Sequence, residues 1–152
     1  MSLTEGDAAP DFTMPATAGR TVSLADYAGK PLLLYFYPKA DTTGCTKEAC
    51  AFQEALPQLG HLGLDVIGVS RDPMKALEKF AEKYGLTFPL ASDEGEVTEA
   101  YGTWVEKSMY GRKYMGIERT TFLIGADGTI SRVWNKVKVT GHVAEVLKAA
   151  GE

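Results

Sequence analysis

Two cysteines, Cys45 and Cys50, carry the most reactive side chains of this chain and lie five residues apart. Disulfide scaffolds are small, cysteine-dense and secreted, so two cysteines among 152 residues do not make one. The chain also lacks the second cysteine pair or nearby histidine that a zinc site needs. We therefore interpret the pair as reactive thiols, the alternative being small buried hydrophobes.

The position of Cys45 favours the reactive interpretation. Residues 35–50 run from the end of an apolar strand into a predicted helix, and reactive groups of open α/β sheets collect at the carboxyl ends of strands. Cys45 would lie in or just before the first helical turn, where free N–H groups and the helix dipole favour a negative charge. A free cysteine titrates near about pH 8.5, and a helix N-terminus beside cations lowers that value.

The elements that position these thiols alternate between strands and helices. Leu32 to Tyr37 form a continuous apolar and aromatic run, typical of a central strand buried on both faces. Leu64 to Ser70 predict a second strand, and apolar residues at helical spacing predict a helix between the two. Together they predict a right-handed βαβ unit with parallel strands. Pro57 is expected to end or kink the helix near its fourth turn.

A further helix and two hairpins are expected around this unit. Asp72 is the expected cap of the helix, Pro73 its first residue and Gly85 its stop. The other expected elements are an N-terminal hairpin of Asp11 to Met14 and Thr21 to Leu24, a second hairpin of Thr121 to Ile124 and Thr129 to Trp134, and a closing helix around Val146. This layout is that of the thioredoxin-like α/β fold, with a central mixed sheet flanked by helices.

Length and composition limit the alternatives. A chain of 152 residues with 45% hydrophobic content predicts a single domain over residues 1–152. The net charge of -4 gives no electrostatic reason to bind nucleic acid or an anionic membrane. Met1 to Pro10 contain no signal-peptide core, and no stretch approaches the about 18 apolar residues of a membrane span. We expect a cytoplasmic protein.

The chain resembles a known family at the cysteines. Pro38, three residues, Thr42, two residues and Cys45 resemble the active-site signature of peroxiredoxins. Cys50, five residues further on, is similar to the bacterioferritin-comigratory-protein or peroxiredoxin Q branch. The likeness extends over nearly the whole chain, through residues 6–12, 110–117 and 119–124.

The resemblance implies a peroxiredoxin variant of the thioredoxin-like fold and a role for each signature residue. Cys45 would be the peroxidatic nucleophile that becomes a sulfenic acid, and Cys50 the resolving thiol that closes a disulfide with it. Pro38 would shield the sulfur, Thr42 would supply a hydroxyl and Arg119 would be the cation. The implied substrates are hydrogen peroxide and organic hydroperoxides. The implied reductant is thioredoxin or a similar dithiol, with no cofactor or metal, and the implied state is a monomer.

Three of the polar residues also allow simpler interpretations. Thr42 could be a helix cap, and Arg119 could be a solvated surface charge. Glu48 lies three residues after Cys45 and so faces the same side of the helix. It could orient Arg119 through a bidentate ion pair, or serve as a first-turn acid that complements the helix dipole.

The histidines and several aromatic residues have no assigned role. We expect His61 and His142 to be solvated. Trp104, Tyr110 and Tyr114 could line the pocket, although buried packing is the commoner use of such side chains.

The main rival function is a thioredoxin-like thiol–disulfide oxidoreductase. Those proteins use a Cys-X-X-Cys motif, whereas four residues separate the cysteines here. They also keep a proline directly before the strand that corresponds to the one beginning at Thr121, and this chain has none there. Both differences favour the peroxidase.

Overall fold

The computed structural model describes residues 3–151, and its largest feature is a seven-stranded mixed sheet with the strand order β2-β1-β5-β4-β3-β8-β9. The strands of this sheet are β1 (Thr13–Ala16), β2 (Arg20–Ser23), β3 (Leu32–Phe36), β4 (Asp65–Ser70), β5 (Leu90–Ser92), β8 (Thr120–Ile124) and β9 (Ile130–Trp134). Two further strands, β6 (Trp104–Met109) and β7 (Arg112–Ile117), pair with each other. The helices are α1 (Thr43–His61), α2 (Met74–Tyr84), α3 (Glu96–Ala100), α4 (His142–Ala150) and the 3-10 helix η1 (Leu24–Tyr27).

The central strand β3 organises the sheet because all five of its residues are buried. It pairs parallel with β4 and antiparallel with β8. Its side chains alternate between two hydrophobic clusters, with Leu34 on one face and Leu33 on the other. The predicted central strand, the parallel pair and both predicted hairpins are therefore confirmed.

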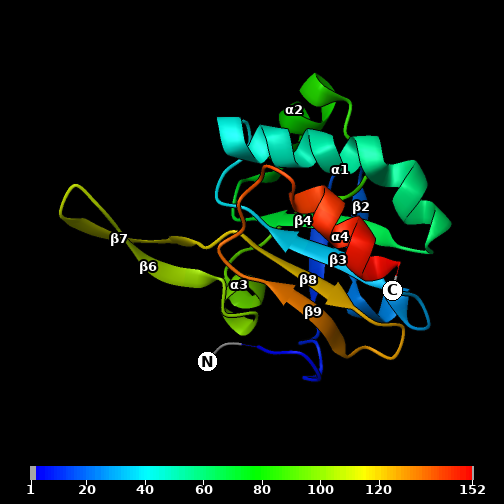
Figure 1. Cartoon of the computed structure of the whole chain (residues 1–152). Coiled ribbons are helices and arrows are strands. Elements are labelled where there is room, and N and C mark those ends of the chain that lie inside the picture. The colour runs from blue at the N-terminus through cyan, green and yellow to red at the C-terminus, as the bar shows by residue number, and fades with distance from the viewer. Residues whose placement is uncertain (1–2, 152) are drawn as a thin grey trace.

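Helices cover both faces of the sheet (Figure 1). On one face, Phe52 of α1, Phe80 of α2 and Val146 of α4 pack in the cluster that contains Leu33. On the other face, Val97 of α3 packs in the cluster that contains Leu34. None of the helices described over residues 3–151 is both long and apolar enough to span a membrane.

The structure decides one open point of the predicted helices and corrects another. Of the two outcomes expected at Pro57, an end or a kink, helix α1 does not show an end and continues to His61, because Pro57 is exposed and the fully buried Leu59 holds the last turns against the body. Figure 1 shows these last turns directed away from the axis of the first ones, as a proline bend allows. Asp72 does not cap α2, whose N-cap is Pro73; its carboxylate instead accepts hydrogen bonds from the Ala40 N–H and the Ser70 hydroxyl, each at 2.8 Å.

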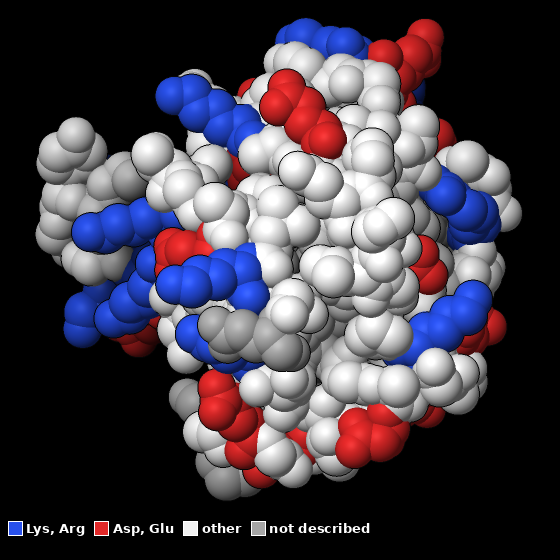
Figure 2. Space-filling view, turned by 45° about the vertical axis from the view of Figure 1, so that its right-hand side comes forward, with Lys and Arg blue, Asp and Glu red and all other residues white. Residues whose placement is uncertain are grey.

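Strands β6 and β7 form a hairpin, which we call the arm (residues 104–117), that projects from the body (Figure 1). Met109 pairs with Arg112, so the arm turns on Tyr110 and Gly111, whose φ angles of 52° and 78° fit a two-residue type I′ turn. The arm contains Lys107, Arg112 and Lys113 but only one acid, Glu106. Figure 2 shows several Lys and Arg side chains toward the left of the molecule, the side from which the arm projects.

Candidate active site

The candidate site lies where β3 ends and α1 begins. Cys45 is the third residue of α1, as predicted for a thiol in the first helical turn, and only 1% of its surface is exposed. Arg119, directly before β8, reaches it from the neighbouring strand. A side chain at Gly44 would meet the guanidinium, since its Cβ would lie 3.3 Å from Arg119 Nη2. Glycine at this position therefore allows the guanidinium to lie close to the helix start.

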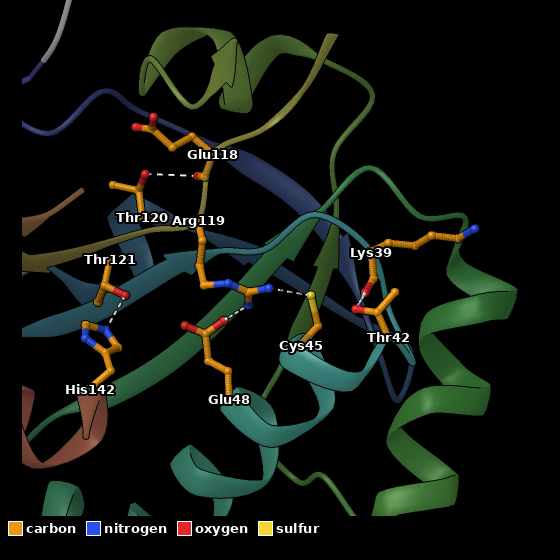
Figure 3. A network of polar contacts seen from close by, with 9 residues as sticks. All are labelled: Lys39, Thr42, Cys45, Glu48, Glu118, Arg119, Thr120, Thr121 and His142. Atoms are coloured by element: carbon orange, nitrogen blue, oxygen red, sulfur yellow. Dashed lines mark hydrogen bonds and ion pairs between the residues drawn. The ribbon is translucent and has the colours of Figure 1, made fainter. Parts of the chain in front are cut away.

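The guanidinium of Arg119 bridges two residues of α1 (Figure 3). Its Nη2 donates to Cys45 Sγ at 3.2 Å, and its Nη1 donates to Glu48 Oε1 at 2.6 Å. Glu48 therefore pairs with Arg119, as one of its two interpretations expected, but the pair is not bidentate, because the second amino group is used by the sulfur. Glu48 Oε2 is buried and has no hydrogen-bond partner among the described residues. Glu48 also lies beyond the first turn of α1, so it is not a first-turn acid.

Burial and the neighbouring charges together set the pKa values of this pair. Glu48 is 1% exposed, and burial raises its pKa to about 7 while the charge of Arg119 opposes that rise. Burial by itself would lower the pKa of Arg119, but the neighbouring Glu48 and Cys45 outweigh it and leave that pKa raised. Arg119 is thus a permanent cation beside the sulfur, and it is not a solvated surface charge. Glu48 can take up a proton near neutral pH.

The loop of residues 38–42 connects β3 to α1 and contains the other two signature residues. Pro38 and Thr42 are both exposed, and Pro38 directly follows the buried Tyr37. Thr42 is the N-cap residue of α1, but its side chain makes no capping hydrogen bond. Its hydroxyl donates instead to the Lys39 carbonyl at 3.0 Å. Thr42 thus stands at the cap position that one interpretation gave it, but its side chain does not cap the helix.

Cys50 lies on the same helix as Cys45, and both are free thiols. Its side chain is half-buried, and burial together with the charge of Glu54 raises its pKa. Five residues along a regular helix place two Cα atoms about 8 to 9 Å apart. A disulfide tolerates at most about 7 Å, so the two cysteines cannot bond while this helix is intact.

His142 was expected to be solvated, and this expectation is wrong. It is 2% exposed, its Nε2 lies 2.8 Å from the Thr121 hydroxyl, and burial lowers its pKa to about 4. Its ring meets Phe52 of α1 edge to face. Figure 3 shows the Thr121–His142 pair on the side of Glu48 away from Cys45. A histidine at the start of an amphipathic helix gives no sequence signal that distinguishes a buried side chain from a solvated one. His61 is exposed, as expected.

The aromatic residues of the arm differ in burial: Trp104 is half-buried and packs against the core cluster that contains Leu34, whereas the two tyrosines are exposed. The Arg71 guanidinium lies 3.4 Å from the centre of the Trp104 ring, which fixes the base of the arm. Tyr110 is 99% exposed and Tyr114 is 44% exposed. Lys107 lies near the site, since its pKa is lowered by burial and then by the charge of Arg119. Sequence reasoning missed Lys107, which lies on a hairpin that was not predicted.

Over residues 3–151, no group of three or more His, Cys, Asp or Glu side chains is arranged to hold a metal ion. The polar groups around Cys45 are those of Arg119 and Glu48.

Comparison with known proteins places this geometry in context. Residues 5–133 match the model of the AhpC/TSA family. A putative peroxiredoxin bcp of Coxiella burnetii is 54% identical over 148 residues, which cover 97% of this chain and 98% of that protein. The peroxiredoxin Bcp of Escherichia coli K12 is 46% identical over 146 residues, covering 95% of this chain and 94% of that protein.

Solved structures of similar proteins also match the chain. A Cys-to-Ser mutant of Xylella fastidiosa PrxQ matches with a TM-score of 0.92 and 38% identity, covering 100% of this chain and 99% of that one. The bacterioferritin comigratory protein of Xanthomonas campestris, whose structure is described in connection with its alkyl peroxide reduction activity, matches with a TM-score of 0.88 and 40% identity, covering 92% and 90%.

Proposed function

Because the chain belongs to the AhpC/TSA family and is a peroxiredoxin, a thiol-dependent peroxidase, we propose that Cys45 attacks the peroxide and that Cys50 resolves the product. The Cys45 thiolate attacks one peroxide oxygen and the O–O bond breaks. The departing oxygen takes up a proton and leaves as water or an alcohol, and Cys45 becomes a sulfenic acid. The Cys50 thiolate then displaces hydroxide from that sulfur, forming a disulfide and, with a proton, water. An external dithiol reduces the disulfide.

The observation that carries this proposal is the Arg119 Nη2 contact with Cys45 Sγ at 3.2 Å. A guanidinium beside the sulfur stabilises a thiolate and also the negative charge that develops on the leaving oxygen. Glu48 fixes the guanidinium through the 2.6 Å contact with Nη1. We assign Arg119 as the electrostatic catalyst and Glu48 as the residue that positions it.

The two residues at the mouth of the site have supporting roles in the proposal. The Thr42 hydroxyl donates a hydrogen bond to the Lys39 carbonyl. The lone pairs of its oxygen therefore remain free to accept a hydrogen bond from the O–H of a hydroperoxide. The exposed ring of Pro38 presents an apolar surface at the end of β3. It would limit access of water to the sulfur.

Resolution by Cys50 requires a change in α1, because the helical distance between the two Cα atoms exceeds what a disulfide accepts. The first turns of the helix must therefore open. Opening one end of a helix costs far less than global unfolding.

The substrate and reductant follow from the chemistry and the relatives. The reported alkyl peroxide reduction by the Xanthomonas relative supports organic hydroperoxides as substrates beside hydrogen peroxide. We assign a dithiol protein of the thioredoxin type as reductant, with the enzyme acting as a cytoplasmic monomer.

A peroxide-consumption assay coupled to thioredoxin, its reductase and NADPH tests the assignment. Cys45→Ser should abolish activity. Cys50→Ser should complete one turnover and stop as a sulfenic acid, detectable by mass spectrometry after dimedone labelling. Coupled turnover by the Cys45→Ser protein at the wild-type rate would refute the assignment.

A further inference from the structure

The loop of residues 38–42 is held by polar contacts rather than by burial. Pro38, Lys39, Asp41 and Thr42 are exposed, and Ala40 is half-buried. Asp41 has a φ of 60°, in the left-handed region that an unrestrained chain seldom adopts. The loop therefore needs specific partners to keep one conformation, and the position of Thr42 depends on them.

The inward partner of this loop is Asp72, at the carboxyl end of β4. Its Oδ2 accepts a hydrogen bond from the Ala40 N–H at 2.8 Å, across 32 residues of sequence. The same oxygen accepts a bond from the Ser70 hydroxyl at 2.8 Å. The backbone carbonyl of Asp72 accepts a further bond from the Ser92 hydroxyl at 2.6 Å. Ser70 of β4 thus fixes the carboxylate and Ser92 of β5 fixes the main chain of Asp72, and the carboxylate fixes the loop in turn.

The contacts on the exposed side of the loop, made by Asp41, restrain it more weakly. Asp41 accepts a hydrogen bond from the Tyr84 hydroxyl at 2.7 Å and pairs with the Lys83 ammonium at 3.0 Å. The side chains of Lys83 and Asp41 are 58% and 45% exposed, and exposed ion pairs contribute little. The contact with the backbone at Ala40 is charge-assisted and half-buried, so it restrains the loop more strongly.

We propose that Asp72 is a positioning residue of the peroxidase reaction, which holds the Ala40 N–H and thereby sets the position of Thr42 relative to Cys45. This inference rests on the proposed role of Cys45. Asp72 touches neither the sulfur nor the peroxide in the reaction described above. Its effect is geometric, and a misplacement of about 1 Å at a reacting group can cost about 100-fold in rate.

Charge and geometry make opposite predictions for Asp72. A carboxylate near the site disfavours a second negative charge on the sulfur, so removing the charge alone should not slow peroxide attack. Asp72→Asn removes the charge but keeps a carbonyl oxygen that can accept from Ala40. Asp72→Ala removes the acceptor as well. The two variants therefore separate a positional role from an electrostatic one.

The test measures the second-order rate of hydrogen peroxide reduction by stopped flow, with dithiothreitol as reductant. Asp72→Ala should lose 10- to 100-fold, on the order of what a displaced reacting group costs, and Asp72→Asn should stay within about threefold of the wild type. Asp26→Ala is the matched control, because Asp26 Oδ2 also accepts a backbone N–H, from Ser23 at 3.0 Å, but is exposed. It should leave the rate unchanged.

Two outcomes would overturn the proposal: a wild-type rate in Asp72→Ala, or an equal loss in Asp72→Asn and Asp72→Ala. If Asp72→Ala fails to fold, Ser70→Ala provides the second variant, since it removes the hydroxyl that fixes the carboxylate. It should lower the rate by a smaller factor, and an unchanged rate there would also refute the role. Activity retained by Cys45→Ser would refute the proposed function itself, so the two failures are distinguishable.

Discussion

Two ion pairs, whose basic residues lie six positions apart in the sequence, are in opposite environments. In the active site, Arg119 and Glu48 approach to 2.6 Å with side chains that are 16% and 1% exposed. On the arm, Lys113 and Glu106 approach to 3.6 Å with side chains that are 76% and 59% exposed. Both pairs join an acid to a base, yet the first is desolvated and the second remains in water.

The difference shows which of the two regions, the active site or the arm, depends on electrostatic interactions. A desolvated pair is costly to assemble and more costly to break, because removal of one partner leaves an uncompensated buried charge. A solvated pair is screened and contributes little. The arm keeps its shape through main-chain pairing between β6 and β7 and through the Arg71–Trp104 contact. Charge should therefore be essential in the site and dispensable on the arm.

The sharpest test compares two arginines. Arg119→Ala should slow peroxide reduction by about 100- to 1000-fold, since it removes the cation at the developing charge. It should also lower the free energy of unfolding by about 1 to 3 kcal/mol, because Glu48 Oε1 remains buried without its hydrogen-bond partner. Arg112→Ala, on the exposed arm, should change that free energy by less than about 0.5 kcal/mol. Stopped-flow kinetics measure the rates of peroxide reduction, and urea unfolding measures the free energies of unfolding. Equal effects of Arg119→Ala and Arg112→Ala would remove the distinction between the two regions.

The pH dependence of stability tests whether Glu48 is desolvated. Its pKa is about 7 in the folded protein against 4.5 for an exposed glutamate, so the folded state holds this proton more tightly. The resulting stabilisation is fully present below pH 4.5 and is lost as pH rises through 7. From pH 5 to 8 the wild type should lose up to about 3 kcal/mol relative to Glu48→Gln. Urea unfolding of the reduced proteins measures this, and parallel pH profiles would show that Glu48 does not titrate in this range.

Hydrogen exchange compares the motion of the two regions. If α1 opens when the disulfide forms, amides 45–52 should lose at least about tenfold in protection in the oxidised protein. Amides of the arm should exchange equally in both redox states, since no cysteine lies on it. Equal protection of amides 45–52 in the two states would contradict the opening of α1.

The smallest expected effect belongs to the arm. Lys113→Ala should change the free energy of unfolding by less than about 0.5 kcal/mol and leave peroxide reduction with dithiothreitol unchanged, because its pair with Glu106 is exposed. A loss above about 1 kcal/mol would mean that the arm is stabilised by charge after all.

The fold was predictable where one physical effect dominated. The apolar run of β3 predicted a central strand because a short apolar run between two prolines is typical of a strand buried on both faces. Gly85 predicted the end of α2, and its φ of 64° is the left-handed conformation that glycine permits. The helical spacing of Cys45 and Glu48 placed both on the face that Arg119 contacts.

The rest depended on contacts between distant residues. Asp72 carries the signal of a helix cap, but a backbone N–H 32 residues away competes for its carboxylate. His142 is buried because Thr121 and Phe52 come from other elements to meet it. The arm exposes most of its side chains, so it has no apolar alternation to detect. Its only local signal is the turn at Gly111.

Pro57 has a kinetic consequence for a helix that must open and close. It lacks an N–H, so the Gln53 carbonyl loses its hydrogen-bond partner in the helix. This gap in the helical hydrogen bonds separates the first turns of α1 from the last. Just before this gap, Phe52 stacks on Tyr35 at 4.7 Å and the Gln53 side chain accepts from the Thr87 N–H at 2.8 Å. Unwinding from the N-terminus would stop at this anchor. The remaining helix would then act as a template when the disulfide is reduced, so that rewinding adds residues to an existing end and avoids the nucleation step, which is unfavourable by about a thousandfold.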